Sequence, residues 1–333
     1  MPLRRWLAAL SLFALDSLHV QRRFLEGKPS AQIALSFCVC SFFFPTFDFE
    51  HNNNTFLTMA PNTGRVAVLS GFAQAVQTLD ACSDGESLFF AQHGLGDVHL
   101  SLVNASTGGF VGGCLLGRTN VMNSQWDPRS KKIVGVVMSD SAGNSVVSLD
   151  ISSCQTRFIA SFPRDYGLLM DAAGLDPVGR EYFTVVQDSD DNSEVLVTSL
   201  DSVNRTRQIR IKDELSPMTL WQSSKGPVLL AYNLGVQQCA GFLAHQSVLA
   251  GKIVSIDMKT GAQTVVVPLV RGIPEQGGMA VQHQMGLLFV AVDYFGDNSV
   301  LTFDLNDGGK QLSTFPLPDD IRFLSYFPKI APK

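Results

Sequence analysis

Short runs of alternating apolar and polar residues, each broken by a turn, recur along most of this 333-residue chain. The clearest example is IVSIDMKTGAQTVVV, residues 253–267, in which two apolar runs flank an Asp and a Lys-Thr-Gly turn. Alternation with a period of two is typical of strands that bury one face. Asp and Gly suit the turn, because Asp bonds the local backbone and Gly tolerates a positive φ. The stretch therefore predicts a β-hairpin.

The same hairpin pattern returns along the chain at intervals of roughly 45 to 55 residues. Aligned on Asp257, its copies have their anchors at Ala60, Asn104, Asp150, Asp201 and Asp304. Units carry a further strand before the anchor, such as EYFTVVQDS, and before it a turn such as LDPVGRE and another apolar run. No run with helical periodicity interrupts the units. Each unit therefore predicts four strands, named a to d here.

Four strands at this period predict the blade of a β-propeller. The six anchors predict an all-β fold, a six-bladed β-propeller of four-stranded antiparallel blades. The first copy has no strand a of its own, while DIRFLSYFPKIAPK at the other end of the sequence has the pattern of a strand a. We expect this C-terminal strand to pair with the N-terminal blade and to close the ring, which removes exposed sheet edges.

The D-x-x-T-G turn of residues 257–261 resembles the repeats of the YVTN and quinoprotein-like β-propellers. The resemblance covers residues ~50 to 330 as a periodic pattern and identifies no specific family. WD40 repeats are disfavoured because their GH and WD dipeptides are absent, and kelch repeats because no paired glycines recur. Propellers host enzymes, receptors and scaffolds, so the resemblance implies a fold and not a function.

The N-terminal residues have the layout of a secretory signal peptide. Arg4 and Arg5 precede an apolar run from Trp6 to Leu15, followed by small and polar residues. No clean A-x-A cleavage site follows, so a short amphipathic leader helix or an extended start stays open. We expect residues 1–30 to be a signal peptide or disordered leader and residues 31–333 to form a single propeller domain. The expected location is secreted or endomembrane, with the cytoplasm as the alternative.

A second apolar stretch, residues 33–47, is broken by Pro45 and is shorter than the ~20 residues of a membrane-spanning helix. We interpret it as a buried strand, with a signal-anchor as the alternative, and expect no stable membrane span. The six cysteines are scattered without a CxxC, which is neither a zinc pattern nor a small disulfide scaffold, and most are expected to be buried thiols. The net charge of −5 without a basic cluster argues against a nucleic-acid partner. We expect a monomer.

In a propeller, the b–c loops and d–a connections share one face, and the a–b and c–d turns share the other. The sequons at Asn104 and Asn204 fall in c–d turns and are predicted glycosylation sites. The opposite face is then free for binding. A long, fairly apolar insertion lies there between two strands of the fifth unit, and we select Gln237, Phe242 and His245 in it as a binding loop. A structural plug is the alternative interpretation.

The starts of the a strands are expected to line the central opening, and they carry Asn123, Asp171, Glu275 and Asp320. Six-bladed propellers of the gluconolactonase and paraoxonase kind hold a metal at this place with Glu, Asn and Asp side chains. That similarity implies a divalent cation such as calcium and lactonase-like or esterase-like hydrolysis. The surrounding motifs of that group are missing, so we expect no resident cofactor and a water-filled polar channel.

No catalytic residue is identified, because HExxH and G-x-S-x-G motifs are absent. The sequence therefore favours a binding or scaffold propeller, not an enzyme, that engages a protein or carbohydrate partner through its b–c loop face. The alternative is a metal-dependent hydrolase with its site on the propeller axis.

Overall fold

The computed structural model describes residues 41–48, 53–59, 66–72, 78–94, 96–138, 143–190, 192–213, 215–233, 250–294, 297–317 and 324–327. By its internal contacts the chain divides into two compact units, Met1–Cys38 and Val39–Lys333. All described residues belong to the second unit. The predicted leader of residues 1–30 lies outside them and stays a prediction.

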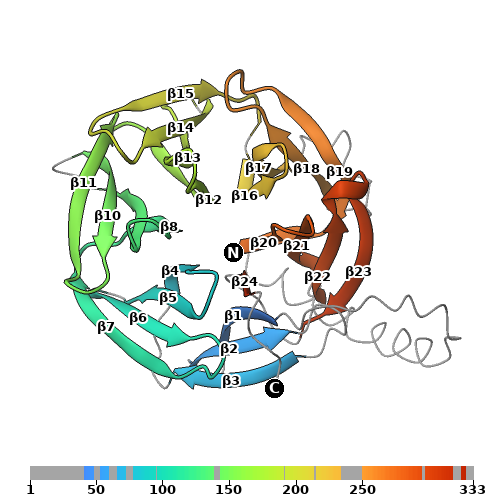
Figure 1. Ribbon diagram of the computed structural model, residues 1–333, viewed down its shortest axis with the longest axis horizontal. Helices are drawn as coiled ribbons and strands as arrows, with labels where there is room; N and C mark the ends of the chain where they lie inside the picture. Colours follow the sequence, from blue (N-terminus) through green and yellow to red (C-terminus); the bar gives the residue numbers. More distant parts are fainter. Residues whose placement is uncertain are drawn as a thin grey trace, which may run out of the picture. The chain divides into compact units, whose positions relative to one another are not determined.

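Five sheets are each built from four consecutive antiparallel strands (Figure 1). Blade β4–β7 consists of β4 (Thr78–Ser83), β5 (Leu88–His93), β6 (Val98–Asn104) and β7 (Phe110–Gly117). Blade β8–β11 consists of β8 (Met122–Asp127), β9 (Lys132–Val137), β10 (Asn144–Asp150) and β11 (Gln155–Phe162). Blade β12–β15 consists of β12 (Gly167–Asp176), β13 (Glu181–Gln187), β14 (Ser193–Ser199) and β15 (Thr206–Arg210).

The remaining two of these five blades follow the same order. Blade β16–β19 consists of β16 (Leu215–Ser223), β17 (Gly226–Asn233), β18 (Ala250–Ile256) and β19 (Gln263–Arg271). Blade β20–β23 consists of β20 (Ile273–Gln282), β21 (Leu287–Tyr294), β22 (Asp297–Asp304) and β23 (Lys310–Pro316), with the 3₁₀ turn η2 (Leu305–Asp307) before its last strand. In each of these blades the first strand is innermost and the last lies on the rim (Figure 1).

The prediction of a six-bladed propeller is wrong, because the described residues form five blades of four consecutive strands. A further four-stranded sheet has the order β24-β1-β2-β3 and joins β1 (Ser41–Asp48), β2 (Asn53–Met59) and β3 (Val66–Phe72) to β24 (Ser325–Phe327). The anchors had counted c–d hairpins, and the hairpin at Ala60 has no strand a of its own before it. Three residue pairs, from Ser41–Phe327 to Phe43–Ser325, connect β24 to β1 in this composite sheet.

Apolar side chains between neighbouring blades form the core. One cluster joins blade β12–β15 to blade β16–β19 and includes Phe183, Val197 and Leu229, each at most 2% exposed. A second joins blade β8–β11 to blade β12–β15 around Tyr182, which has no exposed surface. The period-two pattern of the sequence produces these clusters, because alternate residues of a strand face opposite neighbours. The inner strands of successive blades contact one another and surround a common axis.

Four anchor residues of the repeat cap their own c–d turns, as the sequence suggests. The Oδ1 atom of Asp257 accepts bonds from the backbone N–H groups of Lys259 and Thr260, at 2.9 and 2.8 Å. Asn104, Asp150 and Asp304 accept equivalent backbone bonds in their turns. The last turn residue has a positive φ, 72° at Gly261. The anchor residues therefore stabilise their own turns, on the face that the a–b and c–d turns share.

Cysteine use differs from the expectation of buried thiols. Cys114 on β7 forms a disulfide with Cys154 in the β10–β11 turn, and their Cα atoms are 6.1 Å apart. Cys82 is a buried free thiol. The other cysteines, Cys38, Cys40 and Cys239, lie outside the described residues. The disulfide ties blade β4–β7 to blade β8–β11. In the described part of the chain, no helix has the length and apolar character that crossing a membrane requires.

Candidate functional site

The inner strands of the five blades share a departure from regular pairing near their starts. The register shifts most in β12, after Leu168, and in β20, after Pro274, and shorter shifts occur in β4, in β8 after Met122, and in β16. Three of the predicted metal residues, Asn123, Asp171 and Glu275, fall within these bulges. A bulge turns a side chain out of the ladder, so the repeated irregularity marks the axis as a place where side chains leave the blades.

The side chain of Asn123 on β8 forms hydrogen bonds with the next blade, β12–β15. Its Nδ2 donates to the carbonyl oxygen of Leu169 at 2.8 Å and to Oγ1 of Thr184 at 3.0 Å. Its Oδ1 accepts the backbone N–H of Asp171 at 2.8 Å. Both Asn123 and Asp171 have a positive φ, 54° and 58°, which Asn and Asp tolerate better than other side chains. The amide group of Asn123 therefore has a structural role.

Similar bonds connect other inner strands around the axis. Oδ2 of Asp80 on β4 accepts the backbone N–H of Ser124 on β8 at 3.1 Å. Oγ of Ser216 on β16 donates to the carbonyl oxygen of Met170 on β12 at 2.8 Å. Each bond satisfies a backbone group that the bulge removes from the sheet ladder. The bulges and these side chains hold successive blades together at the axis.

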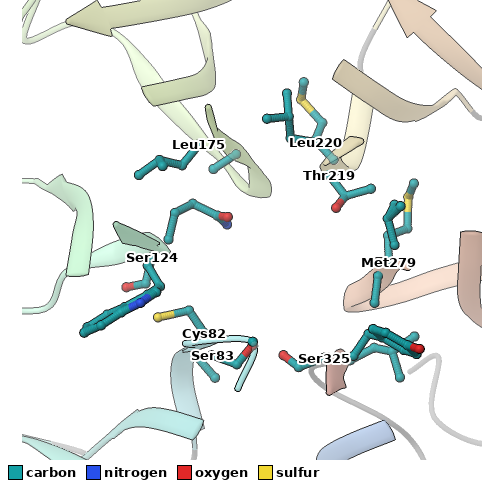
Figure 2. A pocket seen from close by; sticks show the side chains of 18 of the residues that line it. Cys82, Ser83, Ser124, Leu175, Thr219, Leu220, Met279 and Ser325 are labelled. Carbon is teal, nitrogen blue, oxygen red and sulfur yellow. The ribbon is translucent and has the colours of Figure 1, made fainter. Parts of the chain in front are cut away.

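A cavity of about 370 Å³ runs between the inner strands of all the sheets. Figure 2 shows Cys82 and Ser124 on one side, across from Leu220 and Met279. Asp80, Asn123 and Asp171 line it from β4, β8 and β12, and Met218 lines it from β16. One wall therefore carries the carboxylates, and the facing wall carries Leu220 and Met279 with Thr219 between them.

The cavity opens among the a–b turns. Its lining there includes Asp84, Trp126, Pro128, Pro177 and His283, which lie at or just beyond the ends of the inner strands. The sequence had favoured the opposite, b–c face for binding. The mouth lies on the face that also carries the c–d turns.

Comparisons with solved structures agree with this architecture. TolB from Acinetobacter baumannii is similar with 11% identity and a TM-score of 0.63, over 86% of this chain and 66% of that chain. The hydrazine synthase of Kuenenia stuttgartiensis is similar with 14% identity and a TM-score of 0.53, over 91% and 94% of the two chains. A Bacteroides caccae protein of unknown function is similar with 9% identity and a TM-score of 0.54, over 87% and 99%.

The protein is a β-propeller. The predicted fold type is thereby confirmed, and the likeness shows the fold alone, since every identity is far below 25%. This chain spans just under two thirds of the length of the TolB chain. No protein-family model matches the propeller, and no curated protein matches it. The likeness to YVTN and quinoprotein-like repeats stays a resemblance in the turn motif.

The propeller supplies no Lys or Arg side chain to the lining of its axial cavity, within the described residues. Asp80, which is 3% exposed, has a pKa well above its usual range because it is buried and because Asp171 carries a like charge. Burial, with Asp80 and Asp84 nearby, also raises the pKa of the Cys82 thiol. Cys82 is therefore a protonated thiol and a poor nucleophile. The polar wall is thus short of positive charge.

Only two of the four predicted metal residues are found side by side. Asn123 and Asp171 lie together, Glu275 lies in the bulge of β20, and Asp320 falls outside the described residues. The described chain contains no group of three or more His, Cys, Asp and Glu side chains placed to hold a metal ion. Asn123 fits a metal ligand poorly, because its amide oxygen already accepts a backbone bond. The metal site stays a prediction.

Of the remaining predicted sites, the structure describes the two glycosylation sites but not the binding loop. Gln237, Phe242 and His245 lie outside the described residues. Asn204 is exposed in its turn, whereas Asn104 is half-buried and its Oδ1 accepts bonds from Ser106. Both glycosylation sites stay predictions, and Asn204 is the more accessible of the two side chains.

Sequence reasoning missed Asp80, Met218 and Met279. Asp80 lies in TLDACS, a short stretch whose repeat position is visible only once β4 is known to be an inner strand. The two methionines have the pattern of ordinary core residues. Alignment of all inner strands on their bulges is the signal that brings them together with Asn123 and Asp171.

Proposed function

We propose that this propeller is a binding protein whose axial cavity takes an organic cation with an apolar arm. The propeller fold supports a binding or scaffold role in general. The observation that carries the proposal is the lining of the cavity: buried and half-buried carboxylates on one wall, no Lys or Arg among the described lining residues, and the apolar side chains of Met218, Leu220 and Met279 opposite. Its volume of about 370 Å³ suits a small molecule or one long side chain of a partner.

Each wall of the cavity suits one end of such a ligand. An ammonium group placed between Asp80 and Asp171 forms charge-assisted hydrogen bonds with their carboxylates. The apolar arm then packs against Met218, Leu220 and Met279, and methionine adapts its shape to such contacts. Because a cation favours the ionised carboxylate, its binding lowers the pKa of Asp80 and releases a proton at pH values below that pKa.

Titration calorimetry with hexylammonium tests the proposal. Asp171→Asn keeps the shape of the side chain and tolerates the positive φ, but removes the charge, so we expect at least tenfold weaker binding. Asp190→Asn, an exposed substitution at the β13–β14 loop, is the matched control and leaves the affinity within twofold. Absence of saturable binding, or equal affinity in the two variants, overturns the proposal.

We also propose that a protein or glycan partner binds the b–c loop face. The apolar insertion that contains Phe242 in the sequence supports this proposal. Metal-dependent hydrolysis is not included, because Asn123 is already engaged by Leu169, Thr184 and Asp171.

We also propose a secreted or endomembrane location. The Cys114–Cys154 disulfide supports it, since disulfides persist mainly in oxidising compartments. Mass spectrometry of protein from its native source without reductant checks the bond. Free thiols at Cys114 and Cys154 contradict the proposed location.

A further inference from the structure

One blade breaks the rule that governs the c–d turns. In blade β12–β15 the backbone N–H of Ser199 bonds to the carbonyl oxygen of Arg205, so Ser199 occupies the place that Asp257 has in its blade. The enclosed turn, residues 200–204, is one residue longer than the turn between Asp257 and Ala262. The sequence alignment on Asp201 is therefore two residues away from the structural match, because the acid has moved into the turn.

The displaced acid has a different partner. Oδ1 of Asp201 accepts a bond from Nε of Arg180 at 3.2 Å instead of capping the turn as the other anchors do. The end of the turn is also redirected. The N–H of Asn204 donates to the carbonyl oxygen of Ile159 on β11 at 2.9 Å, whereas the N–H of Gly261 closes its own turn on Asp257. The long turn therefore reaches across to the neighbouring blade β8–β11.

Arg180 is held beneath this turn by a buried ion pair. Its Nη1 donates to Oδ1 of Asp127 at 2.5 Å, and the two side chains are 10% and 1% exposed. Arg180 has a φ of 58°, in the left-handed region, where a non-glycine residue costs about 1 to 2 kcal/mol. The matching position in blade β20–β23 is Gly286. In blade β8–β11 the matching position is Lys131, which also has a positive φ but is exposed, so Arg180 is distinguished by its burial.

A crevice of about 370 Å³ opens at this point between the two blades. Val134, Ile159 and Leu200 give it apolar lining, and Phe158 and Val203 extend that surface, although they are 44% and 63% exposed to solvent. It is separate from the axial cavity, which shares no lining residue with it. The crevice exists because the long turn spans the gap that the outer strands of adjacent blades leave.

The charges of the crevice leave one cation over. Three cationic side chains, Lys132, Arg157 and Arg180, line it together with two acids, Asp127 and Asp201. Arg180 pairs with both acids, Asp201 also pairs with Arg129 outside the lining at 3.9 Å, and Lys132 pairs with Asp150 at 3.2 Å. No ion pair between described side chains includes Arg157, which is exposed on β11 beside Phe158. The crevice thus combines an unmatched guanidinium with an apolar wall.

We infer that this inter-blade crevice binds a small monocarboxylate with an apolar tail. The planar guanidinium of Arg157 pairs with the carboxylate, a geometry that arginine forms with two parallel hydrogen bonds. The tail lies along Val134, Ile159 and Val203 and covers Phe158. Asp127 and Asp201 do not repel the ligand strongly, since Arg180 pairs with both and Arg129 also pairs with Asp201. Positions that break a repeat are where function is expected, and this blade breaks it in the residues that form the crevice.

Titration of the intact protein with hexanoate tests the inference. We expect saturable binding that Arg157→Gln weakens at least tenfold. Arg210→Gln, on the outer strand of the next blade and outside the crevice, is the matched control and changes the affinity less than twofold. Hexylammonium is the charge-reversed ligand, and its affinity should not depend on Arg157.

A second variant tests the apolar wall without disturbing the core. Val203→Glu places a carboxylate at the crevice, and it should weaken hexanoate at least tenfold through like-charge repulsion. Val178→Glu, at a side chain that is 82% exposed and does not line the crevice, should leave binding unchanged. The inference is wrong if hexanoate does not saturate, or if binding persists unchanged in both Arg157→Gln and Val203→Glu. Neither result bears on the axial cavity, which hexylammonium reports.

Discussion

The axial cavity and the inter-blade crevice have the same volume but opposite charge and opposite origins. The cavity arises from what the blades share, because each inner strand bulges near its start and presents side chains to the axis. The crevice arises where one blade departs from the others, at the long turn that carries Asp201. Among the described residues, no Lys or Arg lines the cavity, whereas the crevice has one cation beyond its ion pairs. A repeat can therefore provide a scaffold with a central opening, while a single irregular unit adds a second site.

The largest effect that tests this comparison is expected from Arg180→Met. It removes the partner of Asp127 and leaves that carboxylate buried, a change that costs about 3 to 5 kcal/mol. Urea denaturation measures the free energy of unfolding. Arg129→Met is the control, because Arg129 is exposed and 3.9 Å from Asp201, where an ion pair contributes at most about 1 kcal/mol. Equal effects from the two variants contradict a buried pair beneath the crevice.

The next effect concerns the bonds at the axis. Asn123→Gly keeps the positive φ but removes three hydrogen bonds, so we expect a loss of about 3 kcal/mol of unfolding free energy. Asn204→Gly is the matched control: the residue has almost the same φ, 55°, but its side chain is exposed. Its stability should change by less than about 0.5 kcal/mol. A large loss in the control, or a small loss at Asn123, contradicts the role of the bulges in joining blades.

The sequence predicted much of the repeat, and particular residues show why. The alternation in EYFTVVQ predicted β13, and turn chemistry predicted the capping by Asp257, since both depend on neighbours in the chain. The starts of the a strands correctly placed Asn123 and Asp171 at the axis. These features follow from local patterns that repeat, so one clear copy helps to find the others.

Other features depend on contacts that no local pattern contains. The blade count was wrong because the hairpin at Ala60 was counted as a further blade, whereas its sheet takes its first strand, β24, from a distant part of the sequence. The Cys114–Cys154 bond joins two blades across a separation of 40 residues. Asp201 was placed in the wrong register because Ser199 fills the anchor position and the acid two residues later resembles it. The crevice therefore could not be predicted, since it requires the packing of β11 against that turn.

The smallest of the three effects on stability is a dependence on pH at the axis. Burial and the charge of Asp171 raise the pKa of Asp80 in the folded protein, so the folded state holds this proton more tightly than the unfolded state. Its contribution is therefore fully present below the unfolded pKa of about 3.9 and is lost as pH rises through the raised folded pKa.

Thermal unfolding at a series of pH values measures this contribution. Asp80→Asn cannot titrate, so the difference in stability between wild type and variant should fall with rising pH and then level. Asp190→Asn, an exposed substitution away from the cavity, is the matched control for replacing an Asp by an Asn. A difference that rises with pH for Asp80→Asn means that the pKa of Asp80 is lowered, which contradicts the description of the polar wall.

The central claim is that one propeller carries two independent sites of opposite charge. The most direct measurement is a titration with hexanoate in the presence and absence of saturating hexylammonium, repeated with Asp171→Asn and Arg157→Gln. We expect one binding site for each ligand and an unchanged hexanoate affinity when hexylammonium is bound. Asp171→Asn should weaken only the binding of hexylammonium, and Arg157→Gln should weaken only the binding of hexanoate. Competition between the two ligands, or a variant that weakens both equally, contradicts the central claim.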